Sequence, residues 1–326
     1  MKSKIALLLL LALVLVSACE SSKNTDVSSN ETYNQVPEFN ADSAYAFIQK
    51  QVDFGPRVPM TKGHQLTKEW IIEKFKSYGL EVKEQDFQTK THDGLTWDLT
   101  NIIASFNPSA SKRIMISAHW DTRRIADKDT QRIDEPIDGA NDGASGVGMA
   151  LEIARVLATS DLQPDVGVDF ILFDGEDDGE PESSYNRNNS QVWWCLGSQH
   201  WSKNPHQNGY NAYYGILLDM VGAKGARFYR EGYSRYYAKN IVNKVWNFGI
   251  ELGYSDYFIL QDAGEITDDH YFVNKDAKIP MINIIEFSPN TGFGRYHHTH
   301  DDNMDLIDVR TLKAVGQTVL FTLYQE

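Results

Sequence analysis

The feature that most constrains the fold of this chain is a series of short apolar segments that alternate with helix-like segments. Residues 113–118 and 166–173 are rich in large apolar side chains, which is typical of strands buried on both faces of a sheet. The other predicted strands span 80–89, 100–106, 216–218 and 281–286, and the predicted helices span 41–51, 65–78, 144–158 and 309–324. This alternation predicts a single α/β domain over residues 40–326, with a mixed, largely parallel central sheet flanked by helices on both faces.

Residues 1–18 have the features of a secretory signal peptide. Lys2 and Lys4 precede an apolar run over residues 5–16, which is short for a membrane-spanning helix and suits a signal peptide. The following Val-Ser-Ala-Cys segment resembles the lipobox of bacterial lipoproteins, in which the cysteine, here Cys19, is acylated and becomes the new N-terminus. We therefore expect a lipoprotein signal peptide over 1–18 and a lipidated flexible tether over 19–39. The lipid would hold the protein in the bacterial cell envelope, at the outer membrane; an uncleaved anchor or a soluble export signal is the alternative.

Charge and cysteine content exclude two classes of protein. The net charge is −14, and because an acidic protein repels a phosphate backbone, we expect no binding of nucleic acid. The chain has two cysteines, Cys19 and Cys195. With Cys19 in the export signal, Cys195 has no intrachain partner, which excludes a disulfide framework. We expect Cys195 to be a buried small side chain rather than a reactive thiol.

Ionisable residues follow several of the predicted strands. His119 and Asp121 come directly after the strand at 113–118, Asp174 to Asp177 follow the strand at 166–173, and Asp219 follows the strand at 216–218. Because parallel strands end at the same edge of a sheet, these side chains should lie close together. Carboxylates and imidazoles without clustered thiolates suit a catalytic zinc ion, which keeps three protein ligands and one open position. In an adjacent carboxylate pair, one member can bind the metal while the other transfers protons.

Together with four further blocks, these residues resemble the zinc exopeptidase superfamily and, within it, the glutaminyl cyclases (glutaminyl-peptide cyclotransferases) of the animal and Bacteroidetes type. The matching blocks are 118–121, 141–146, 173–177, 196–200, 217–222, 268–270 and 298–303, in a stretch from about Phe47 to the C-terminus. The resemblance implies a zinc-dependent catalytic domain over 40–326. It would convert the N-terminal glutamine of peptides and proteins to pyroglutamate, release ammonia and use one Zn²⁺.

The resemblance also implies a role for individual residues. Asp142, Asp177 and His298 match the three zinc ligands. Glu176 matches the general acid/base, and Asp219 and Asp268 match the acidic pair that forms a hydrogen-bond network with it. The expected substrate pocket is lined by Trp193, Trp194, Met220, Ile285 and His297. Asp177 replaces the glutamate and His297 the tryptophan found in animal cyclases, and His297 and His300 are further candidate ligands.

A dizinc aminopeptidase of the same superfamily is the main alternative. In such enzymes the positions of His119 and Asp219 hold a second metal ion, and that of Asp142 bridges the two ions. Two features favour the cyclase: Asp268 stands where the peptidases commonly have serine, and a long polar loop occupies residues 178–193. A non-catalytic envelope binding protein is a third possibility, which the full retention of acidic residues at the five strand ends and following loops argues against.

Overall fold

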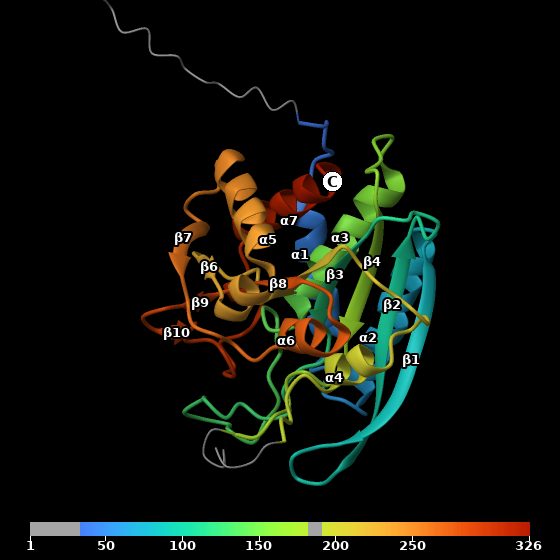
Figure 1. Ribbon diagram of the computed structural model, residues 1–326. Coiled ribbons are helices and arrows are strands. Elements are labelled where there is room, and N and C mark those ends of the chain that lie inside the picture. The colour runs from blue at the N-terminus through green and yellow to red at the C-terminus, as the bar shows by residue number, and fades with distance from the viewer. Residues whose placement is uncertain (1–32, 182–190) are drawn as a thin grey trace, which may run out of the picture. The chain divides into compact units, whose positions relative to one another are not determined.

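The computed structural model describes residues 33–181 and 191–326 (Figure 1). The predicted signal peptide, the predicted lipidation site Cys19 and most of the predicted tether lie outside the described residues, as do residues 182–190 of the polar loop. Residues Asn34–Glu326 form one compact unit. Within the described ranges, no helix is both long enough and apolar enough to cross a membrane.

A six-stranded sheet lies at the centre of this unit, with the strand order β1-β2-β4-β3-β5-β8. The strands are β1 (Glu81–Lys90), β2 (Thr96–Phe106), β3 (Arg113–His119), β4 (Gly167–Phe173), β5 (Tyr214–Asp219) and β8 (Met281–Ile285). β4, β3, β5 and β8 run parallel to one another, whereas β2 is antiparallel to both β1 and β4. The predicted mixed, largely parallel sheet is therefore confirmed.

Helices cover both faces of the sheet, as predicted (Figure 1). On one face, Ile114 and Ile116 belong to the main core with α1 (Ala41–Asp53), α2 (Lys62–Ser77), α3 (Ala144–Thr159), α5 (Gly232–Glu251) and α7 (Val309–Tyr324). On the other face, Met115 and Leu217 pack in a smaller core with Trp201 of α4 (Leu196–Lys203). Because side chains alternate along a strand, one apolar run supplies both cores.

The remaining elements are short and lie towards the C-terminal half. They are β6 (Phe228–Arg230), β7 (Phe258–Asp262), α6 (Asp269–Phe272), the π-helix η2 (Val273–Ala277), β9 (Phe287–Ser288), β10 (Gly292–Phe293) and the 3₁₀-helix η3 (Met304–Leu306).

The sequence did not predict α5, β6 or β7, and it placed the start of β2 four residues late. The N-terminus of α5 is capped by Glu231, whose carboxylate accepts hydrogen bonds from the backbone N–H groups of Tyr233 and Ser234 at 2.9 and 2.6 Å. Glutamate is not among the preferred N-cap residues, so this start carries no strong signal. β2 begins early because its pairing with β1 continues beyond the apolar segment, to the pair of Lys90 and Thr96.

Candidate functional site

The three predicted zinc ligands converge from different parts of the chain beyond the carboxyl ends of the parallel strands. His298 Nε2 lies 3.1 Å from Asp177 Oδ1 and 3.9 Å from Asp142 Oδ2. Two ligands on one tetrahedral zinc ion are about 3.3 Å apart when each bond is about 2.0 to 2.1 Å. The three side chains are buried, yet all three line one cavity. The two distances to His298 therefore suit a metal site that a substrate can reach from that cavity.

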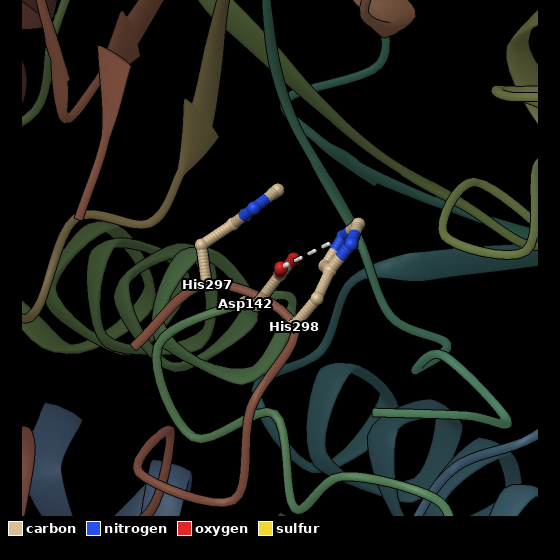
Figure 2. A group of neighbouring side chains, drawn as sticks. All are labelled: Asp142, His297 and His298. Atoms are coloured by element: carbon tan, nitrogen blue, oxygen red, sulfur yellow. Dashed lines mark ion pairs between the residues drawn. The ribbon is translucent and has the colours of Figure 1, made fainter. Parts of the chain in front are cut away.

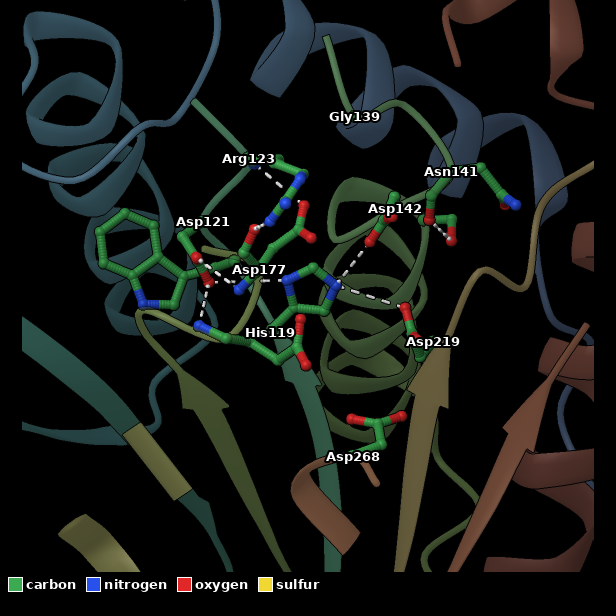
Figure 3. A network of polar contacts seen from close by, with 12 residues as sticks. His119, Asp121, Arg123, Gly139, Asn141, Asp142, Asp177, Asp219 and Asp268 are labelled. Atoms are coloured by element: carbon green, nitrogen blue, oxygen red, sulfur yellow. Dashed lines mark hydrogen bonds and ion pairs between the residues drawn. The ribbon is translucent and has the colours of Figure 1, made fainter. Parts of the chain in front are cut away.

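A second cluster shares Asp142 with the first (Figure 3). His119 Nε2 lies 3.0 Å from Asp142 Oδ1 and 3.3 Å from Asp219 Oδ1, and the ligand atoms of these three buried residues all lie within 4.8 Å of one another. The two oxygens of Asp142 thus face different histidines. This is the arrangement that the resemblance implied for a second metal ion bridged by Asp142.

The chemistry of the donors fits zinc. Oxygen and imidazole donors without clustered thiolates suit a catalytic Zn²⁺. His298 Nδ1 lies 3.3 Å from Asp127 Oδ1, so the charge of Asp127 favours the ring orientation in which Nε2 faces Asp177 and Asp142. Carboxylate–histidine pairs of this kind commonly support metal ligands.

Buried negative charge dominates the electrostatics around Glu176. Burial raises the pKa of Glu176 well above its usual range; His119 opposes this shift, and Asp268 adds to it. Burial also raises the pKa of Asp219 to about 7, with the hydrogen bond to His119 opposing and the charge of Asp268 contributing. A bound divalent cation would lower these pKa values, because its positive charge favours the ionised forms.

The carboxylates of Asp121 and Asp302 hold the backbone of the predicted ligands. Asp121 accepts hydrogen bonds from the N–H groups of Glu176 and Asp177 at 3.0 and 3.1 Å. Asp302 accepts hydrogen bonds from the N–H groups of Asn141 and Asp142 at 2.7 and 2.9 Å. Both positions lie in blocks that the sequence had singled out, but the sequence assigned them no role.

Two buried arginines complete this support, and no motif in the sequence marks either of them. Arg57 donates to the carbonyl oxygens of Trp120, Asp138 and Gly139 at 3.2, 2.6 and 2.6 Å. Gly139 has a φ of 57°, and a Cβ there would lie 2.8 Å from the Arg57 guanidinium, so this approach requires glycine. Arg123 donates from its backbone N–H to Asp177 Oδ2 at 2.9 Å and lies over the Trp194 ring.

The predicted pocket residues all line one cavity of about 430 Å³ beside the two clusters. Its walls include Trp193, Trp194, Met220, Ile285 and His297, together with Glu176 and Asp268. The Trp194 ring stacks on His298 with centroids 5.7 Å apart. The cavity thus combines an aromatic wall with the carboxylates and imidazoles of the site.

His297 and His300, the two further candidate ligands, differ in position. The ligand atoms of His297, His298 and Asp142 lie within 4.8 Å of one another (Figure 2), but His297 Nδ1 is 2.8 Å from Lys128 Nζ. Burial and the neighbouring His298 lower the pKa of His297 well below its usual range. His300 Nδ1 lies 2.8 Å from Asp129, and His300 belongs to none of the three ligand-like groups that the described residues form.

Comparison with known proteins identifies the family of this chain. The model of Peptidase family M28 matches residues 101–323. The glutaminyl-peptide cyclotransferase of Drosophila melanogaster is 25% identical, over 82% of this chain and 77% of the relative. The glutaminyl cyclase of Bacteroides thetaiotaomicron, solved with N-acetylhistamine, is 49% identical with a TM-score of 0.86, over 90% of this chain and 100% of that one. A leucine aminopeptidase precursor from Bacteroides thetaiotaomicron VPI-5482 is 48% identical with a TM-score of 0.85, over 90% of this chain and 99% of that one. The chain therefore belongs to Peptidase family M28 and has the zinc exopeptidase-like fold of the bacterial glutaminyl cyclases.

Proposed function

We propose that this protein is a zinc-dependent glutaminyl-peptide cyclotransferase, which converts the N-terminal glutamine of peptides and proteins to pyroglutamate and releases ammonia. The observation that carries the proposal is the position of Glu176. Its carboxylate lines the cavity next to the predicted zinc ligand Asp177 and is grouped with Cys195 and Asp268, not with Asp142, His119 or His298. It is thus free to transfer protons there. The likeness to cyclases from bacteria and animals gives the reaction.

Asp142, Asp177 and His298 would hold the zinc ion in this enzyme. The ion, when bound, supplies Lewis-acid polarisation of the glutamine side-chain carbonyl. The remaining steps belong to side chains of the cavity. Because the nucleophile and the carbonyl are in one substrate molecule, the walls need only hold that molecule in a bent, reactive conformation.

Glu176 acts first as the general base and then as the general acid. It takes a proton from the α-ammonium group of the substrate, and the freed amine attacks the side-chain carboxamide carbon. A new C–N bond closes the five-membered ring. The ring nitrogen still carries two hydrogens after the attack and loses one of them to solvent. Glu176 then returns its proton to the leaving nitrogen, and the C–N bond of the carboxamide breaks, so that one ammonia and one proton leave in all. Asp219 and Asp268 orient the leaving nitrogen and keep the pKa of Glu176 in a useful range.

The aromatic wall supports the choice of substrate. Trp193, Trp194, Met220 and Ile285 give the cavity an apolar lining that suits the methylene groups of a glutamine side chain. His297 adds a polar group at the position of a tryptophan in the animal cyclases. We assign this wall the role of holding the substrate bent above the ligand cluster.

The dizinc aminopeptidase remains the second candidate, because His119, Asp142 and Asp219 are already arranged as three ligands of a second ion. Zinc content and products distinguish the two enzymes. About one zinc per chain with ammonia release from a Gln-peptide supports the cyclase. Two zinc ions with release of free amino acids supports the peptidase, in which Glu176 would activate a bridging water. If the protein showed neither ammonia release nor release of amino acids, the result would support a non-catalytic binding protein.

We further propose that the protein is a lipoprotein of the bacterial cell envelope, attached to the outer membrane by a lipid on Cys19. Support comes from the basic and apolar segments of residues 1–18 and from the lipobox-like residues before Cys19. The test is metabolic labelling with a fatty acid, followed by membrane fractionation. Labelling that disappears in a Cys19→Ala variant supports the proposal, and an unlabelled wild-type protein in the soluble fraction contradicts it.

A further inference from the structure

Cys195 lies at the start of α4, directly against the backbone of Glu176. Its N–H donates to the Glu176 carbonyl oxygen at 3.0 Å, and the N–H of Leu196 donates to the Gly175 carbonyl oxygen at 2.9 Å. These two hydrogen bonds tie the first turn of α4 to the segment that follows β4. The backbone of Cys195 is left-handed, with φ 60° and ψ 38°, a conformation that is strained for a residue with a Cβ.

The thiol of Cys195 makes a second contact with the same residue. Cys195 Sγ lies 3.1 Å from Glu176 Oε1 and donates a hydrogen bond to it. Among the described residues, the Cys195 thiol is the one side-chain donor that forms a hydrogen bond with the Glu176 carboxylate. Cys195 is fully buried, and burial raises the pKa of its thiol well above the usual value, so the proton needed for donation stays on sulfur.

We propose that Cys195 is a positioning residue for Glu176, whose carboxylate it holds beside Asp268 and away from the zinc ligands. A glutamate side chain has several rotatable bonds, and the predicted zinc ligand Asp177 is the next residue in the chain. Without a hydrogen-bond donor, the Glu176 carboxylate could therefore rotate into other orientations, including towards the zinc ligands. Ligand atoms of Glu176, Cys195 and Asp268 all lie within 4.8 Å of one another. The left-handed backbone of Cys195 directs its side chain into this group.

Positioning of this kind affects the chemical step more than substrate binding. General acid/base catalysis requires the carboxylate to lie within hydrogen-bond reach of the proton that it moves. Loss of the donor would spread the carboxylate over several orientations, and a smaller fraction would be productive. Substrate binding depends instead on the cavity walls. If Cys195 only filled space, its replacement would not lower kcat selectively while leaving KM unchanged.

Three substitutions and one control test the inference on the zinc-loaded enzyme. Cys195→Ser keeps a donor, whereas Cys195→Ala and Cys195→Val remove it. Valine is larger than cysteine and β-branched, which adds strain at the left-handed backbone of residue 195, so its Tm is compared with wild type before its kcat is interpreted. Leu196→Val is the matched control, because Leu196 is the next residue and packs with Trp97 and Leu99, without polar contact to Glu176. For each variant we would measure kcat, KM, zinc content and a crystal structure.

We expect the alanine and valine variants to lose about tenfold in kcat with KM nearly unchanged, and the serine variant to stay within about twofold of wild type. Zinc content should be unchanged, and the Glu176 carboxylate should occupy more than one orientation in the alanine variant. A serine variant as slow as alanine, or full kcat in all three, would overturn the inference.

The inference rests on the proposed function, but the two can fail separately. If wild type releases no ammonia from Gln-peptides, the proposed function fails. The comparison of serine with alanine would then be made on aminoacyl substrates, for which Glu176 would act as the base, and the same outcomes decide it.

Discussion

Asp302→Ala should weaken both the fold and the metal site, although Asp302 is not one of the predicted ligands. Its buried carboxylate accepts hydrogen bonds from the N–H groups of Asn141 and Asp142, at 2.7 and 2.9 Å. Each buried N–H left without an acceptor costs about 1 to 3 kcal/mol. Burial and the charge of Asp142 raise the pKa of Asp302 to about 7, so removing the carboxylate also relieves some repulsion. We therefore expect a net loss of about 2 to 3 kcal/mol in the free energy of unfolding.

Asp302→Ala should also lower the affinity for zinc, because hydrogen bonds from the two N–H groups to Asp302 hold the backbone from which the Asp142 side chain extends. Removing a residue that supports a metal ligand typically lowers affinity by about 10- to 100-fold. Urea unfolding would measure the stability, and competition with a chelator would measure the affinity. Asp301→Ala is the matched control, because Asp301 is the neighbouring aspartate and is exposed. If Asp302→Ala matched this control in both measurements, the positioning role of Asp302 would be refuted.

Three other perturbations test separate parts of the account. Glu176→Gln should keep zinc and lose at least about 100-fold in kcat; normal turnover would show that another group moves the proton. Although burial opposes the shift, the positive charge of His270 and hydrogen bonds with Ser234 lower the pKa of Glu231 from 4.5 to about 2. Its ionised form thus adds stability, at most about 3 kcal/mol, which is present above pH 4.5 and disappears as the pH falls towards 2. Unfolding measured between pH 5 and pH 2 should depend less on pH in Glu231→Gln, and an unchanged pH dependence would contradict this. Removal of zinc with a chelator should lower Tm, because the buried carboxylates lose their counter-ion, and added zinc should restore it; equal Tm values with and without zinc would rule out zinc binding by the folded state.

Much of the fold could be predicted because its signals are local. The segments at 113–118 and 166–173 became β3 and β4, since apolar runs of that length have few other ways to be buried. Helix α5 was not predicted because its N-cap is a glutamate and its backbone departs from helical geometry at Ala238. Its position depends on packing against β8 and α7, which a single sequence does not reveal.

His119, Asp177 and Asp219 could be placed together because they lie at or just after the carboxyl ends of parallel strands. Asp142, Asp268 and His298 do not follow such a strand directly, and only the resemblance to the cyclases identified them. The residues that hold these side chains in place could not be predicted from strand ends or from the resemblance. Arg57 and Asp127 lie in segments without a motif, and each acts through contacts with residues far away in the chain. Burial of Cys195 was predicted. Its contact with Glu176 was not, because it depends on the left-handed backbone conformation of Cys195, which no local sequence signal indicates.

The products formed from a peptide with N-terminal glutamine test the central claim most directly. Mass spectrometry of the reaction with the zinc-loaded enzyme should show the intact peptide less one ammonia. Free glutamine together with a peptide one residue shorter would contradict the claim and identify the enzyme as an aminopeptidase.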